Sequence, residues 1–228
     1  MCWSGEASAV LATCGFASTT YVAVKGEDKN VWLPLGYFSL MEALQAATYS
    51  VIDQCALPSN QVLTLLGFLH ISFQPFFINM ASMHFIPPER RARIATLVYS
   101  LCLFGTMAFL VRLYPFDWAG ACIKNWHALC GDRLCSVHGS WHIAWEVPLN
   151  GLSWLGWGYY FPAFLLPIIY GSWRFTLYHI LVGPTAALLT TSSWNEWPAV
   201  WCLFSIGLLL VVIKTPVRKI LYQRRWFF

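Results

Sequence analysis

Apolar stretches of about twenty or more residues recur along this chain and constrain its fold more than any other feature. A helix of roughly 20 apolar residues spans the hydrocarbon core of a bilayer. The composition agrees, since only 11% of the residues are charged, against about a quarter in soluble domains. The stretches occupy residues 5–24, 31–54, 60–86, 92–114, 143–170, 173–191 and 195–215. We therefore expect an all-α integral membrane protein, with seven transmembrane helices in one domain over residues 1–228.

The basic residues fall unequally on the two sides of these stretches. One side collects eleven of the fourteen, whereas the other has only Arg112, Lys124 and Arg133. Because Lys and Arg accumulate in cytoplasmic loops, we expect the N-terminus outside and the C-terminus in the cytoplasm. Residues 115–141 then form an external loop and residues 216–228 a basic cytoplasmic tail. A plasma membrane or a bacterial inner membrane is the expected location.

The net charge of +4 is small and its basic residues sit in short loops. This pattern excludes nucleic acid as an expected partner, because nucleic-acid binding requires clustered basic residues. The lipid bilayer is the first expected partner, and a second membrane protein is another.

Glu42 lies near the middle of the second apolar stretch. A carboxylate at this depth costs roughly 3 kcal/mol or more, so it must face a polar partner, face a cavity or be protonated. Gln45 follows Glu42 by three residues, which places both side chains on one face of a helix. We therefore expect a polar stripe along this helix that other helices cover.

The third stretch carries His70 and Gln74 one helical turn apart. Antiparallel adjacency of the second and third helices predicts that Glu42, Gln45, His70 and Gln74 lie at similar depth. His179, near the middle of the sixth stretch, is the further residue expected to reach this interior. A closed hydrogen-bond network that locks two helices is one interpretation of the set. The other is a site, with Glu42 and His70 as catalytic or proton-carrying groups and the remaining three as ligand-binding groups.

A second constellation is His138, His142 and Glu146, each four residues from the next. On a helix this spacing places two imidazoles and a carboxylate on one stripe, a donor set that suits zinc, copper or iron. The alternative is an interfacial helix whose polar residues face water. Gly139 and Pro148 argue against a regular helix here.

Eight cysteines are present. The three within apolar stretches, Cys14, Cys102 and Cys202, are expected to be small buried thiols. Five fall on the expected external side, where disulfides form in an oxidising compartment: Cys2, Cys55, Cys122, Cys130 and Cys135. We expect at least one disulfide among the last three, either Cys130 with Cys135 or Cys122 with one of them. A zinc site using Cys130, Cys135 and His138 is the less favoured alternative.

Two resemblances add to these expectations. The opening Met1-Cys2-Trp3-Ser4 and the stretch from Tyr37 to Gln45 resemble an uncharacterised family of small polytopic membrane proteins, a similarity that implies no known activity. The expected topology also resembles the alkaline ceramidase and adiponectin-receptor type of intramembrane zinc hydrolase. Those proteins carry His-x3-His in the last helix, and the stretch from Trp194 to Lys214 contains no histidine. That likeness is therefore one of topology alone.

Three hypotheses about function follow. The leading one is a membrane protein whose interior or outer half binds a metal ion or a small polar ligand. One form of it is a metalloenzyme acting on a lipid-soluble substrate, with the metal as Lewis acid and Glu42 or Glu146 as ligand or base. The second is a proton- or ion-coupled transporter in which Glu42 and His70 titrate. The third is a structural subunit of a membrane complex.

Overall fold

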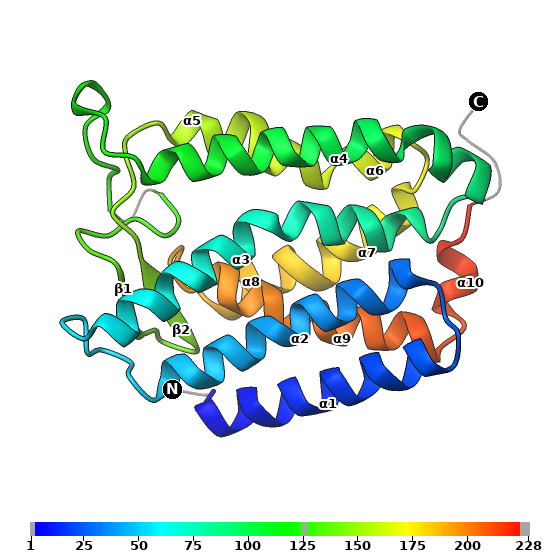
Figure 1. Ribbon diagram of the computed structural model, residues 1–228, viewed down its shortest axis with the longest axis horizontal. Helices are drawn as coiled ribbons and strands as arrows, with labels where there is room; N and C mark the ends of the chain where they lie inside the picture. The colour runs from blue at the N-terminus through cyan, green and yellow to red at the C-terminus, as the bar shows by residue number, and fades with distance from the viewer. Residues whose placement is uncertain (1–2, 125–126, 224–228) are drawn as a thin grey trace.

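The computed structural model describes residues 3–124 and 127–223, and this part of the chain is mostly helical. The long helices lie side by side along the long axis of the molecule (Figure 1). The first four are α1 (Gly5–Val24), α2 (Lys29–Tyr49), α3 (Pro58–Met83) and α4 (Pro88–Leu110). They match the first four apolar stretches, and prolines at the start of α3 and α4 mark two of the boundaries.

The second half of the chain is divided into shorter elements. These are η1 (Val111–Leu113), η2 (Asp117–Ala119), β1 (Cys135–His138), β2 (Ile143–Glu146), α5 (Ser153–Leu155), η3 (Gly156–Tyr160), η4 (Phe161–Phe164), α6 (Leu166–Ile169), α7 (Trp173–Ile180), η5 (Leu181–Thr185), α8 (Ala186–Thr190), α9 (Trp197–Lys214) and α10 (Val217–Leu221). Two of them, η3 and η5, are π-helical. Pro162 lies in η4 and Pro184 in η5, where a missing backbone N–H interrupts the regular α-helical pattern.

Among the described residues, three helices are long and apolar enough to cross a membrane: Gly5–Val24, Pro58–Met83 and Pro88–Leu113. They indicate an integral membrane protein in contact with lipid. The other four expected spans do not reach this standard. The helix α2 carries Glu42 and Gln45, the apolar part of α9 (Trp197–Ile213) is shorter, and the fifth and sixth are divided. The count of seven stays a prediction.

The strands β1 and β2 form an antiparallel hairpin, in which His138 pairs with Ile143 and Cys135 with Glu146. The expectation of an all-α protein is wrong at this point, and the fifth apolar stretch does not begin at residue 143 as a helix. A local cause is the turn Gly139–Ser140, because glycine and serine are weak helix formers that favour turns. The hairpin lies at the same end of the molecule as the start of α1 (Figure 1).

Buried Asn60, near the start of α3, attaches this hairpin to the helices. Its side-chain amide donates to the carbonyls of Val51 (2.8 Å) and Ser136 (3.0 Å) and accepts from the Ser136 backbone N–H (2.9 Å). The Ser136 hydroxyl also meets the Thr64 hydroxyl at 2.7 Å. These contacts satisfy the edge of β1 and fix its position over the bundle.

Helices approach each other closely where a glycine, which has no side chain, lies at the contact. A Cβ atom added at Gly15 of α1 would lie 2.1 Å from the Ser39 hydroxyl oxygen of α2. A Cβ at Gly105 of α4 would lie 2.8 Å from the Tyr159 carbonyl oxygen of η3. Close packing at small residues is the usual way that helices associate in membranes. The main apolar core lies between α2, α3 and α9 and includes Leu35, Phe68 and Ile206.

The opposite end of the bundle is held by ion pairs. Arg218 of α10 donates to both carboxylate oxygens of Glu27 (3.0 and 2.9 Å), and Arg91 of α4 donates to Asp28 at 2.6 Å. Partial burial acts to raise the pKa of Asp28, but the Asn30 backbone N–H and the Arg91 guanidinium outweigh it and lower the pKa to about 2. This end therefore joins the α1–α2 connection to α4 and to α10.

Candidate functional site

The central polar residues of α2 are completely enclosed. Glu42 is 0% exposed and Gln45 is 1% exposed. Both carboxyl oxygens of Glu42, and both the oxygen and the nitrogen of the Gln45 amide, have no hydrogen-bond partner among the described residues. Four unpaired polar atoms one helical turn apart are costly in a protein interior, where buried polar groups are nearly always bonded.

The expected hydrogen bond between Glu42 and the face of α3 that carries His70 and Gln74 is absent from the described structure. The His70 ring instead stacks on Tyr37, with 3.8 Å between ring centroids. Tyr37 lies five residues before Glu42, about 7.5 Å along the helix axis. Tyr37 also stacks on Phe77, seven residues further along α3, with 3.6 Å between ring centroids, so its contact with His70 does not fix the height of Glu42. The similar depth of Glu42 and His70 therefore stays a prediction.

Gln74 contacts Cys202 of α9. The Cys202 thiol lies 3.9 Å from the Gln74 side-chain oxygen. The Gln74 side-chain nitrogen and the His70 Nε2 have no hydrogen-bond partner in the described part of the chain. Ser8 of α1 faces the Glu42 carboxyl. Its hydroxyl oxygen accepts a hydrogen bond from the Trp3 indole at 2.8 Å, which leaves the hydroxyl proton available to Glu42.

His179 of α7 does not share this environment. Its Nε2 accepts a hydrogen bond from the Trp201 indole N–H at 3.2 Å, and its ring lies parallel to that of Phe175. The side chain is 1% exposed. His179 is thus engaged by the aromatic residues of α7 and α9, and no hydrogen bond in the described residues links it to Glu42.

The outer constellation does not form the expected stripe, because its residues lie on a hairpin and not on a helix. His138 is exposed and its Nδ1 pairs with Asp53. Buried His142 meets the Tyr49 hydroxyl through Nδ1 at 2.8 Å, while Glu146 lies opposite Cys135. Among the residues that the structure describes, no group of three His, Cys, Asp or Glu side chains could hold a metal ion. Zinc, copper or iron binding stays a prediction without a site here.

Two of these outer groups have shifted pKa values. Burial lowers the pKa of His142 to about 3, so its ring is neutral at physiological pH. Partial burial acts to raise the pKa of Asp53, but the hydrogen bonds from His138 outweigh it and lower the pKa. Asp53 also adopts a positive φ of 64°, a conformation that aspartate tolerates better than most residues.

Two disulfides are present. Cys122 pairs with Cys130, which confirms the expectation of a bond within that loop. Cys135 pairs with Cys55, so the alternative pairing of Cys130 with Cys135 and the zinc alternative are both wrong. Disulfides indicate an oxidising compartment, so the hairpin end has extracellular parts. Cys102 and Cys202 are buried thiols as expected, Cys14 is exposed, and Cys2 lies outside the described residues.

Glu196, directly before α9, is completely buried under the hairpin. Its carboxylate accepts hydrogen bonds from the backbone N–H groups of Trp141 (2.6 Å) and His142, and from the hydroxyls of Ser140 (2.9 Å) and Thr191 (2.6 Å). Four donors satisfy this carboxylate, so its role is to hold the hairpin turn against the start of α9.

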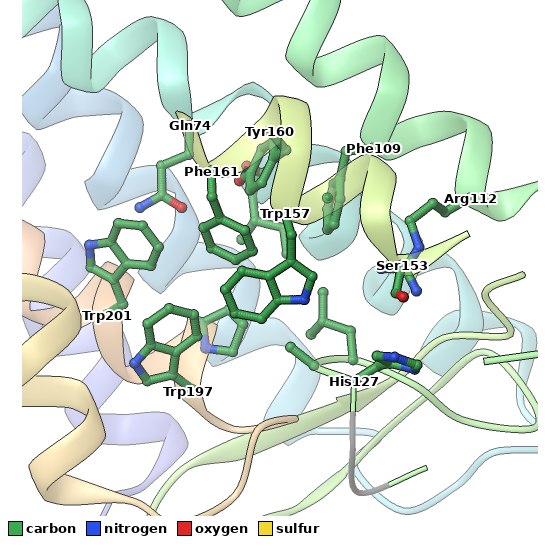
Figure 2. A pocket seen from close by; sticks show the side chains of 15 residues that line it. Gln74, Phe109, Arg112, His127, Ser153, Trp157, Tyr160, Phe161, Trp197 and Trp201 are labelled. Atoms are coloured by element: carbon green, nitrogen blue, oxygen red, sulfur yellow. Dashed lines mark hydrogen bonds between the residues drawn. The ribbon is translucent and has the colours of Figure 1, made fainter. Parts of the chain in front are cut away.

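An aromatic cleft was not foreseen from the sequence. It lies between the outer end of α4, the η3–η4 segment, the start of α9 and residues 127–129. Figure 2 shows Trp157, Phe161, Trp197 and Trp201 gathered between Gln74 on one side and Arg112 on the other. Arg112 is 4% exposed, and its Nε has no hydrogen-bond partner among the described residues. An arginine near the end of an apolar stretch predicts an interfacial charge, which is why the cleft was missed.

Together these features define an integral membrane protein with a disulfide-linked outer end and unpaired polar groups in its interior. The chain belongs to a family of unknown function, DUF5765, whose model matches residues 6–222. No curated protein and no solved structure matches the chain. This membership agrees with the resemblance of the sequence to an uncharacterised membrane family and assigns no activity.

Proposed function

We propose that this membrane protein binds a small polar ligand at Glu42 and Gln45 of α2. The observation that carries the proposal is the set of four unpaired side-chain oxygen and nitrogen atoms on these two enclosed residues. An unpaired buried donor or acceptor costs about 1–3 kcal/mol each, and a bound partner removes that cost. A ligand that donates to the carboxyl and both donates to and accepts from the amide satisfies all four atoms.

The chemical class follows from these atoms. The Glu42 carboxyl accepts hydrogen bonds when it is ionised, and the Gln45 amide offers two donors and one acceptor. A small amide or a short chain of water molecules has both the donors and the acceptors, whereas an ammonium ion has donors alone and would leave the Gln45 amide nitrogen unpaired. Neither the His142 Nε2 nor the Gln74 amide nitrogen has a hydrogen-bond partner in the described residues, so both extend the set of available groups.

Proton- or ion-coupled transport is the second candidate. The observation that favours it is the route from Glu42 to the outer hairpin along α2. Tyr49 lies one turn after Gln45, and its hydroxyl meets the Nδ1 atom of His142 at 2.8 Å. A carboxyl group followed by hydroxyl and imidazole groups is a typical proton relay in membrane proteins.

Native mass spectrometry of the purified protein tests the binding proposal. The wild-type protein should carry an added mass of a small molecule, an ion or retained water that Glu42→Gln loses or reduces. Glu89→Gln is the matched control, because Glu89 is an exposed acid in the first turn of α4. Identical bound mass in wild-type and Glu42→Gln protein contradicts the proposal. Proton flux into proteoliposomes that disappears with Glu42→Gln would favour the transport candidate.

A further inference from the structure

Arg112 is a buried cation without a counter-charge. It lies in η1, directly after α4, with a side chain that is only 4% exposed. One of its terminal nitrogens reaches the Asn150 carbonyl oxygen at 3.4 Å, whereas Nε has no hydrogen-bond partner in the described part of the chain. No described acidic side chain forms an ion pair with it. Such a charge is costly unless an anion compensates it.

The guanidinium lies at one side of the aromatic cleft. In Figure 2, Ser153 and His127 lie on the same side as Arg112, while Gln74 lies on the opposite side. Burial and the nearby Arg112 charge both lower the pKa of His127, so its ring does not add a second fixed positive charge. The cleft therefore has a single cationic end and an aromatic body.

The walls of the cleft are suited to an apolar chain. Trp157 of η3 and Trp197 of α9 face into it (Figure 2), and the Phe161 ring stacks on Trp157 with 4.7 Å between ring centroids. The cleft volume of about 40 Å³ corresponds to roughly three water molecules. This space is the size of a small oxyanion head group, so a chain attached to that head lies along the aromatic wall.

We propose that the cleft binds a single-chain amphiphile whose oxyanion head, a carboxylate or a phosphate, pairs with Arg112 while its chain lies against Trp157 and Trp197. The planar guanidinium matches both oxyanions with two parallel N–H donors, which a neutral head group does not use. This site has its charged end at Arg112 and differs from the one proposed at Glu42 and Gln45, although Gln74 lies at the far side of the cleft and is also near that inner site.

The position of the cleft agrees with entry from the membrane. Arg112 lies at the end of the Pro88–Leu113 span, on the side of the disulfide-linked loops. An amphiphile in that leaflet has its head at the interface and its chain toward the middle of the bilayer. Trp157 is 57% exposed on the outside of the bundle, so one wall of the cleft is accessible from the lipid.

Equilibrium binding of radiolabelled decanoate, decyl phosphate and decanol to the full chain in dodecyl maltoside tests this inference. Binding to empty micelles is subtracted, and pH 8 keeps both acids ionised. We expect both anions to bind saturably and at least roughly tenfold tighter than decanol. Arg112→Gln should abolish this preference, whereas Arg133→Gln, at an exposed arginine of the outer loop, should keep it. The ratio of decanoate to decyl phosphate affinity distinguishes the two head groups.

A second variant keeps the test decisive if Arg112→Gln does not fold. Trp157→Ala should weaken the binding of decanoate and of decanol by a similar factor, so the preference for the anion should remain. Trp154→Ala, at a tryptophan that is 56% exposed and outside the cleft lining, is its control. Equal binding of decanoate and decanol to the wild-type protein overturns the proposal. So does competition by inorganic phosphate as effective as that by decyl phosphate. Glu42→Gln should leave decanoate binding unchanged, which separates this test from that of the inner site.

Discussion

Glu42 and Glu196 are both 0% exposed, yet their surroundings are opposite. Glu196, under the outer hairpin, accepts four hydrogen bonds from backbone and hydroxyl donors. Glu42, in the middle of α2, accepts none from the described residues. The chain therefore has the means to satisfy a buried carboxylate and uses them at one site only. A saturated carboxylate indicates a structural role, and an unsaturated one indicates a group available for binding or proton transfer.

The same contrast extends to whole regions. The outer end is closed by two disulfides, the hydrogen bonds of Asn60 and those of Glu196. The helical interior keeps unpaired groups on Glu42, Gln45 and Gln74. Changes at the outer end should therefore reduce stability, whereas changes in the interior should mainly reduce function. The predictions below test this difference, beginning with the largest expected effect.

Removing the Cys55–Cys135 bond should have the largest effect on stability. It closes a sequence separation of 80 residues, whereas Cys122–Cys130 closes one of 8. The chain-entropy estimate gives about 4.5 kcal/mol for the long loop and about 2.6 kcal/mol for the short one. Alanine substitution of both partners of each bond, followed by denaturant unfolding, measures the two values. A larger loss of stability on removal of Cys122–Cys130 would contradict the prediction that the bond closing the longer loop stabilises the protein more.

Asn60→Ala should be the next most damaging change. It removes four side-chain hydrogen bonds and leaves the Val51 and Ser136 backbone groups without their partner, at a cost of about 3 kcal/mol. Gln61→Ala is the neighbouring control, because Gln61 is exposed and donates only to the Cys55 carbonyl. Its expected cost is below about 1 kcal/mol. If Asn60→Ala and Gln61→Ala lose equal stability in thermal unfolding, the hairpin does not depend on Asn60.

Asp28 provides an intermediate case, a partly exposed carboxylate at the other end of the bundle. Its folded pKa of about 2 lies below the ordinary value of 3.8. The stabilisation is therefore fully present above pH 3.8 and is lost as the pH falls toward 2. Because solvent screens this ion pair with Arg91, we expect about 1 kcal/mol. The free energy of unfolding, measured between pH 5 and pH 2, should decrease in the wild-type protein and decrease less in Asp28→Asn.

Gln45→Leu should have the smallest effect on stability and the opposite sign. Replacing an unpaired buried amide with an apolar side chain removes a desolvation cost, so we expect no loss or a gain of up to about 1 kcal/mol. Bound small ligand should decrease in the same variant. A loss of stability above about 2 kcal/mol would mean that Gln45 has a structural partner. The polar groups of the interior would then be structural, like those of the outer end.

The sequence predicted the fold best where local patterns decide it. The helices α1 to α4 follow uninterrupted apolar stretches, and Pro58 and Pro88 mark two starts. The hairpin was missed because Ile143 to Leu149 continue the apolar pattern of the segment that follows. The partner of Cys135 was missed because Cys55 is 80 residues away, and spacing does not determine disulfide connectivity.

The candidate site was predicted in part for the same reason. The burial of Glu42 and Gln45 followed from the cost of polar groups in hydrocarbon, which depends on their own positions alone. Their neighbours depend on how the faces of the surrounding helices meet, which is a tertiary property, and Tyr37 contacts His70. The cleft around Arg112 requires α3, the end of α4, the η3–η4 segment, the start of α9 and residues 127–129 to meet, so it has no local signature.

The central claim is that Glu196 is structural and Glu42 is functional, and matched amide substitutions test it most directly. Glu196→Gln and Glu42→Gln should be compared by thermal unfolding in the same detergent. Glu196→Gln replaces one carboxylate oxygen with an NH2 group, which cannot accept the hydrogen bonds that the four donors make. We therefore expect a loss of stability of about 3 kcal/mol and a decrease in Tm of about 6–12 °C. Glu42→Gln should shift Tm by less than about 2 °C, because no described donor depends on it. Equal decreases, or a larger one for Glu42→Gln, would contradict the account.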